Sequence, residues 1–267
     1  MQGKSAQNVE ITFPDAIESA YETNGIEEKI GEVTIQNNKL CFDMASYRPK
    51  TFAVRLKKGN VKAAPIKNIP LQLPFNSKAF TPENFGYTVS FDKKGNSFAA
   101  ELIGDKVTCD NITFSIADHE NKNVIKCKGD TIQLPKEAAG KKLYILAAST
   151  DKDRKSTFLV NGKSHEFEIP YYSGFYGQWG HKGVSDGYIR NASLAYIGSH
   201  RHTEKGNDTY IYTYMYKLGI ELPQEAHTLV LPKDENIAVF AITLSDNYID
   251  DISTANEMRT LPLEVSK

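Results

Sequence analysis

The sequence lacks the features of a membrane-spanning or nucleic-acid-binding protein. None of its apolar runs approaches the roughly 20 residues that a transmembrane helix needs. Its 32 lysines and arginines are balanced by 33 aspartates and glutamates, so there is no basic excess to contact a phosphate backbone. We therefore expect no membrane span and no nucleic-acid partner.

Cysteines and targeting signals are also scarce. Cys41, Cys109 and Cys127 are odd in number and far apart, so they indicate neither a disulfide framework nor a paired-cysteine metal site. Buried apolar thiols are the favoured interpretation, and a Cys109–Cys127 pair is the alternative. Residues 1–10 contain no apolar segment typical of a signal peptide. The cell compartment stays open; it is periplasmic or extracellular if a signal peptide has been removed.

Long helical patterns and the common nucleotide, zinc-protease and serine-hydrolase motifs are absent as well. Short alternating segments separated by turn residues take their place. Asn161-Gly162 predicts a tight hairpin, and 143–148 is apolar on both faces, as expected of a central strand. These patterns predict an all-β fold, an antiparallel β-sandwich of jelly-roll or Greek-key type.

Turn and proline patterns indicate how the chain divides. Residues 15–21 are compatible with one or two helical turns, and strand patterns follow over 33–56. Prolines are frequent over 59–88 and disfavour helices and central strands there. The expected parts are a small N-terminal β segment (1–58), a linker (59–74), the main β-sandwich (75–250) and a C-terminal tail (251–267).

The clearest strand pattern lies within 196–223. Apolar and aromatic side chains alternate there with polar ones, which is typical of a half-buried antiparallel strand. One face carries Tyr210, Tyr212, Tyr214, Tyr216, Leu218, Ile220 and Leu222. We favour packing of this face against a core edge or a neighbouring domain, and an open binding face is the alternative.

Two histidines precede this strand, within the run Ser199, His200, Arg201, His202. Side chains at i and i+2 of a strand point the same way, so the two imidazoles could share a metal ion with Asp208 as the third ligand. Alternatively, His200, Arg201 and His202 donate hydrogen bonds to a sugar or a carboxylate. A purely structural role in tying the turn to a neighbouring strand is the third interpretation.

The second candidate site is the aromatic, glycine-rich loop over 171–190. It contains Trp179, the only tryptophan, next to Gln178 and close to Tyr176. Aromatic faces beside amide and charged groups suit sugar rings, because a ring stacks on the apolar face of a pyranose while polar groups bond its hydroxyls. The alternative is that these aromatics close one end of the sandwich core.

Several motifs, taken in order, resemble the C-terminal β region of bacterial family 38 glycoside hydrolases, the α-mannosidases. The first, at 47–56, is similar to the family strand Y-x-P-R-T-F-A-V-K-L. The others are 73–76 (LPFN), 95–102 (GNSFAAEL), 143–149 (LYILAAS), 177–179 (GQW) and 199–202 (SHRH). The resemblance covers about residues 20–245. After Trp179, Gly180-His181-Lys182-Gly183 replaces the more acidic, aromatic continuation usual in the family.

The resemblance implies an accessory role. In that family an N-terminal α/β domain carries the aspartate nucleophile and the zinc ligands. We find no counterpart of that domain in this sequence. We therefore assign no catalytic residue and expect no cofactor, because the zinc of the family would sit in the missing catalytic domain. The expected partners are a glycan or that catalytic domain.

The favoured function is a non-catalytic accessory β-sandwich module of a carbohydrate-active enzyme. It would pack on an α-mannosidase catalytic domain or bind glycan itself. The expected contact residues are Trp179, Tyr176, Gln178, His200, Arg201 and His202. One alternative is a self-standing glycoside hydrolase acting on α-mannosides, with His200 or His202 beside Asp208 or Asp186. The other is a structural cell-envelope β protein without a ligand.

Overall fold

The structure of the protein, a computed structural model, describes residues 5–13, 15–57, 66–83, 89–178, 188–190 and 192–246. Nearly all regular structure in these residues is β, with two short 3₁₀ turns, η1 (Ala100–Leu102) and η2 (Lys136–Ala138). No helix in them is long and apolar enough to span a membrane. The chain forms two compact units, 1–64 and 65–267, each considered separately below.

The first unit consists of two three-stranded antiparallel sheets. One has the order β1-β5-β4 and the other β3-β2-β6. The strands are β1 (Ala6–Thr12), β2 (Ile17–Thr23), β3 (Lys29–Glu32), β4 (Thr34–Gln36), β5 (Lys39–Met44) and β6 (Thr51–Leu56). The predicted turn at Asn37-Asn38 joins β4 to β5, and both residues adopt the positive φ that such hairpin turns require.

The prediction of helical turns over 15–21 is wrong. This segment lies in β2, which pairs with β6 on one side and β3 on the other. Ile17 and Ala20 join Leu40 in the small core of the unit. Burial of these side chains between two sheets therefore overrides the weak local preference of a short segment for helix.

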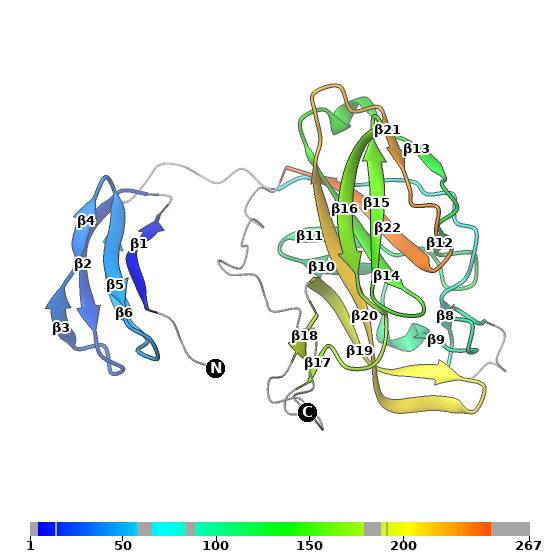
Figure 1. The fold of residues 1–267 in the computed structure, drawn as a ribbon, viewed down its shortest axis with the longest axis horizontal. Helices are drawn as coiled ribbons and strands as arrows, with labels where there is room; N and C mark the ends of the chain where they lie inside the picture. The colour runs from blue at the N-terminus through cyan, green and yellow to red at the C-terminus, as the bar shows by residue number, and fades with distance from the viewer. Residues whose placement is uncertain are drawn as a thin grey trace, which may run out of the picture. The chain divides into compact units, whose positions relative to one another are not determined.

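The second unit is built on an eight-stranded sheet with the order β12-β22-β14-β20-β19-β9-β8, and β7 pairs with β22 outside this path. In Figure 1 the green β14, the gold β20 and the orange β22 are its long central strands. Its members are β7 (Asn68–Pro70), β8 (Phe80–Thr81), β9 (Ser97–Ala99), β12 (Ile125–Lys126), β14 (Lys142–Ser149), β19 (Ser193–Thr203), β20 (Gly206–Glu221) and β22 (Ile237–Ser245).

A four-stranded sheet, β13-β21-β15-β16, accompanies the large sheet, and the hairpins β10–β11 and β17–β18 complete the unit. These strands are β10 (Lys106–Cys109), β11 (Ile112–Ser115), β13 (Thr131–Gln133), β15 (Arg154–Val160), β16 (Lys163–Ile169), β17 (Gly177–Gln178), β18 (Tyr188–Ile189) and β21 (Thr228–Val230). As predicted, Asn161-Gly162 closes the β15–β16 hairpin with both residues at positive φ.

Strand β14 is buried along its whole length, as its apolar sequence predicted. Alternate residues enter two hydrophobic clusters: Leu143 and Ile145 one, Tyr144 and Leu146 the other. Side chains of a strand alternate between the two faces of its sheet, so the large sheet has apolar packing on both sides. This arrangement confirms the predicted all-β sandwich.

The N-terminal edge of the second unit differs from the expected linker over 59–74. Residues Asn68–Pro70 form β7, which pairs with the end of β22. Asn68 lies opposite Ser245, and Pro70 lies opposite Thr243. Leu71 also donates its backbone N–H to the carbonyl of Ile242. The stretch from residue 68 onward is therefore a sheet edge, a position where proline is tolerated because one side of the strand needs no hydrogen-bond donor.

None of the three cysteines, all within the described residues, forms a disulfide. Cys127 is fully buried, and Cys41 and Cys109 are partly buried. Burial raises the pKa of the Cys127 thiol well above its usual range, so this thiol stays protonated and packs as an apolar group. The alternative Cys109–Cys127 pairing is therefore not formed.

Phe98 on β9 is the centre of an aromatic cluster. Its ring lies 5.2 to 5.8 Å from the ring centroids of Phe80, Phe91, Tyr172 and Phe240. We expect Phe98→Ala to lower the free energy of unfolding by about 3–5 kcal/mol, because it removes these contacts and leaves a cavity. Urea unfolding of the full chain measures the change.

Phe175→Ala is the matched control, because its ring is 61% exposed. A surface truncation of this kind should change the free energy of unfolding by no more than about 0.5 kcal/mol. Equal losses in the two variants would contradict the assignment of Phe98 to the core.

Candidate functional site

The candidate site lies on the β19–β20 hairpin, the yellow strand pair in Figure 1. The outer half of β19 is held between two strands, because Arg201 and His202 pair with Phe98 and Ser97 of β9 and with Asp208 and Asn207 of β20. The turn η1 follows β9 directly. Strand pairing therefore brings η1 beside the histidines of β19, although almost a hundred residues separate them in sequence.

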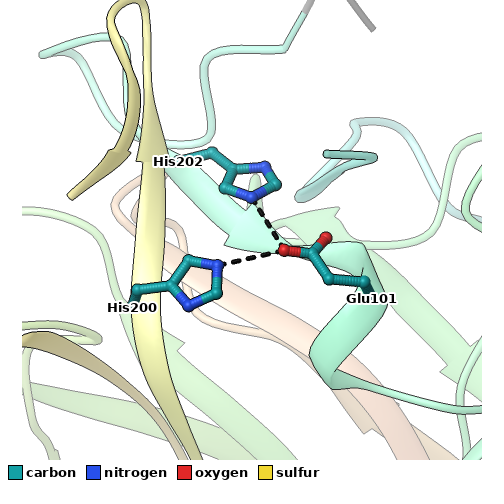
Figure 2. A group of neighbouring side chains, drawn as sticks. All are labelled: Glu101, His200 and His202. Carbon is teal, nitrogen blue, oxygen red and sulfur yellow. Dashed lines mark hydrogen bonds and ion pairs between the residues drawn. The ribbon is translucent and has the colours of Figure 1, made fainter. Parts of the chain in front are cut away.

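His200 and His202 point the same way, as expected for positions i and i+2 of a strand, and both reach the carboxylate of Glu101 on η1 (Figure 2). The Nε2 atoms of His200 and His202 lie 3.0 and 2.9 Å from the same oxygen, Oε1. The imidazole centroids are 5.5 Å apart, with an angle of 29° between the ring planes. The three side chains thus converge on one point.

The polar groups behind the histidines are also ordered. Ser199 Oγ lies 3.3 Å from His200 Nδ1 and can orient that ring. The side chain of His202 is only 5% exposed and that of His200 15%, whereas Glu101 keeps 30%. The cluster is therefore shielded on the histidine side and open on the glutamate side.

Asp208, expected as a third metal ligand, has a different partner. Its carboxylate accepts hydrogen bonds from Arg201, at 2.8 Å from Nε and 2.7 Å from Nη2. Arg201 and Asp208 are opposite each other across β19 and β20, so they share a face, while the histidines of the cluster alternate with Arg201. The carboxylate beside the histidines is Glu101 instead, which sequence reasoning missed because nothing local links positions 101 and 200.

A cleft of about 800 Å³ adjoins the cluster on the glutamate side. Glu101 lines it, together with Ile103 and Asp105 of the loop after η1 and with Ile116 and Asp118 of the segment after β11. The Glu101 carboxylate therefore stands between the histidines and a solvent-filled, acidic space.

The tyrosine strand is interrupted by a bulge. Gly198 of β19 pairs with Thr213, but His200 pairs with Thr209, so three residues of β20, 210–212, lie opposite Ser199 alone. Tyr210 adopts a φ of +64° there, a conformation that is unusual for a bulky residue. The bulge preserves the alternation of faces because it adds two residues rather than one.

The four tyrosines consequently have two different environments. Tyr214 and Tyr216 are buried, as the packing interpretation predicts, but Tyr210 is 81% and Tyr212 39% exposed. Gly174 donates its backbone N–H to the carbonyl of Tyr212, which places the exposed Phe175 next to that strand. We call Phe175, Tyr210 and Tyr212 the aromatic surface.

The predicted loop contacts have mixed outcomes. Tyr176 is half-buried, and its ring stacks at 6.5 Å from Tyr216 while its hydroxyl donates to the Ala192 carbonyl. Gln178 lies in β17, paired with Tyr188. Trp179 lies outside the described residues, as do His181 and Asp186. Tyr176 thus contributes to the core edge, and the role of the others in ligand contact stays a prediction.

Arg190 anchors the loop. Its guanidinium donates to the carbonyls of Tyr171 and Ser173 and to the hydroxyl of Tyr216, and its side chain is 8% exposed. Burial raises the pKa of Tyr216, so the phenol stays neutral and can donate to the Tyr171 carbonyl. The buried arginine therefore fixes the loop from which Phe175 projects.

Gly198 is required for the close approach of β19 to β20. A Cβ at this position would lie 2.5 Å from Thr213 Oγ1 and 2.8 Å from the Tyr196 hydroxyl. We expect Gly198→Ala to lower the free energy of unfolding by about 1–3 kcal/mol, because the buried Thr213 side chain and the Tyr196 ring must move to admit the methyl group. Denaturant unfolding monitored by circular dichroism measures the change in this free energy.

Gly104→Ala is the control, because a Cβ there has no neighbouring atom within 4 Å. A change of no more than about 0.5 kcal/mol is expected for it. If Gly198→Ala behaved like this control, the strands would not be held as closely as described.

Comparison with known proteins identifies the fold family. The family described as "AziU2-like beta-sandwich domain" matches residues 67–248, more than half of the chain and nearly all of the second unit. The match agrees with the two-sided packing of the large sheet. No curated protein matches the chain. The chain therefore belongs to the family of AziU2-like β-sandwich domains.

Proposed function

We propose that this chain is a non-catalytic accessory module of a carbohydrate-active enzyme, resembling the C-terminal region of the α-mannosidases, and that it binds glycan. The observation that carries the proposal is the aromatic surface. Tyr210, Tyr212 and Phe175 hold exposed rings on a paired strand and an anchored loop. The backbone on either side of these rings is held by strand pairing and by the anchored loop, which limits the conformational entropy lost when a ligand binds.

The chemistry of the surface suits a sugar. The flat face of an aromatic ring packs against the C–H groups of a pyranose, and a tyrosine hydroxyl can also bond a sugar hydroxyl. The Arg201–Asp208 pair on the same hairpin adds charged hydrogen-bonding groups beside these rings. Apolar and polar groups close together are the usual composition of a specific ligand site.

The bulge in β20 supports a functional role for this surface. Bulges re-aim side chains and occur near binding sites, and a bulky residue at positive φ indicates backbone strain that packing must offset. Tyr210 has this strained conformation although its side chain is largely exposed and packs little against the protein interior. The resemblance to α-mannosidases favours α-mannosides as the ligand class.

Packing on a catalytic domain is the second candidate, and one observation favours it. Ile197, on the strand next to the tyrosines, is 56% exposed and has no polar group to offer a sugar. An exposed aliphatic side chain beside aromatic ones is typical of a protein interface. The same surface would then contact an α-mannosidase catalytic domain.

Tyr212→Ala tests the glycan proposal. We expect the wild-type chain to bind α-linked mannose oligosaccharides, and the variant to bind about five- to tenfold more weakly, because one stacking ring is worth roughly 1–1.5 kcal/mol. Isothermal titration calorimetry with a mannose oligosaccharide series measures both. Tyr47→Ala, at an exposed tyrosine of the first unit, is the matched control and should bind as the wild type does.

Failure of the wild-type chain to bind any member of a glycan array would contradict glycan binding. Equal affinity of the Tyr212 and Tyr47 variants would instead remove the aromatic surface from the site. Hydrolysis of the oligosaccharide during the titration would favour the self-standing glycoside hydrolase.

A further inference from the structure

We propose that Glu101, His200 and His202 form a binding site for a first-row divalent cation, for which Zn²⁺ is the probe. Two imidazole nitrogens and one carboxylate oxygen converge there, and the candidate ligand atoms all lie within 4.8 Å of one another. Imidazole and carboxylate are preferred ligands of zinc and its neighbours in the first transition row. Neither glycan binding nor the family assignment requires such a site.

The spacing of the ligand atoms requires only a small adjustment. Ligands about 2.1 Å from a tetrahedral zinc ion stand roughly 3.4 Å apart. The Nε2 atoms of His200 and His202 now lie 3.0 and 2.9 Å from Glu101 Oε1. The Glu101 carboxylate, which is partly exposed, would therefore have to move away from the imidazoles by about half an ångström to admit the ion.

The strands preorganise the two nitrogens. His200 and His202 project from one face of β19, whose outer half is paired on both sides, with β9 and β20. Ser199 Oγ can accept a hydrogen bond from the Nδ1–H group of His200, and in that tautomer the Nε2 lone pair is available to the ion. Metal-binding histidines usually donate a hydrogen bond from the ring N–H that does not face the ion, and such contacts increase the affinity for the metal.

The local charge suits a cation. Glu101 supplies a negative charge, and the only cation within the SHRH run, Arg201, is neutralised by Asp208. The cleft on the glutamate side adds the acidic residues Asp105 and Asp118. The Glu101 carboxylate beside a neutralised Arg201 therefore favours a divalent ion at the three ligand atoms.

Three protein ligands leave one position of a tetrahedral ion open. Sites with this ligand count accept water or a ligand atom at the fourth position, whereas purely structural zinc sites are closed by four protein ligands. Glu101 is both a ligand and part of the cleft wall. The fourth position would face that cleft, so the proposed ion would be accessible from solvent and exchangeable.

Zinc titration of the full chain tests the proposal. The chain, freed of metal by chelation, is dialysed against Zn²⁺, and the bound metal is measured by mass spectrometry. About one ion per chain is expected. His202→Ala and Glu101→Gln should each weaken binding by at least about 100-fold, and Ser199→Ala by roughly 10-fold through its contact with His200. His227→Ala, an exposed histidine of the same unit, should bind as the wild type does.

A second readout separates loss of the site from loss of the fold. Co²⁺ in place of Zn²⁺ should give the visible absorption of a tetrahedral ion in the wild type and the His227 variant, and not in the Glu101 variant. Circular dichroism shows whether each variant is folded. Absence of stoichiometric binding by the folded wild type, or unchanged affinity in a folded Glu101→Gln variant, would overturn the proposal and leave the cluster as a hydrogen-bonded contact between η1 and β19.

Discussion

The register of β19 against β20 is the constraint on which both candidate sites depend. The register of the two strands shifts by one residue between Leu194 and Tyr196, and then by two residues opposite Ser199. Because an even shift preserves the alternation of faces, His200 and His202 keep one side of the hairpin. The extra residues project Tyr210 and Tyr212 into solvent. The bulge opposite Ser199 therefore affects both the histidine cluster and the aromatic surface.

This irregularity is possible because the rest of the sheet is strongly held. β14 is buried on both faces and lies between β20 and β22, so the inner half of β20 cannot shift without disrupting two hydrophobic clusters. The buried Arg190 fixes the loop beside the tyrosines in the same way, through three hydrogen bonds to backbone and side-chain oxygens. A rigid centre thus positions a strained, exposed edge, which is the usual arrangement of binding sites on β scaffolds.

The sequence predicted features that depend on local chemistry. The all-β class, the turn at Asn161-Gly162 and the two-sided burial of 143–148 follow from turn residues and apolar patterns, and the structure confirms them. The helical turns over 15–21 were wrong because long-range pairing decided that segment. Glu101 was unpredictable because it meets His200 only through the β9–β19 pairing, and the two environments of the tyrosines depend on a bulge that leaves the period-two pattern intact.

Metal binding by the histidine cluster can be tested directly by crystallography. Crystals of the full chain grown with one equivalent of Zn²⁺ can be measured on both sides of the zinc absorption edge. We expect one strong anomalous peak about 2.0–2.2 Å from Nε2 of His200, Nε2 of His202 and a carboxylate oxygen of Glu101. A well-ordered cluster without an anomalous peak, with both imidazoles still bonded to Glu101, would contradict it.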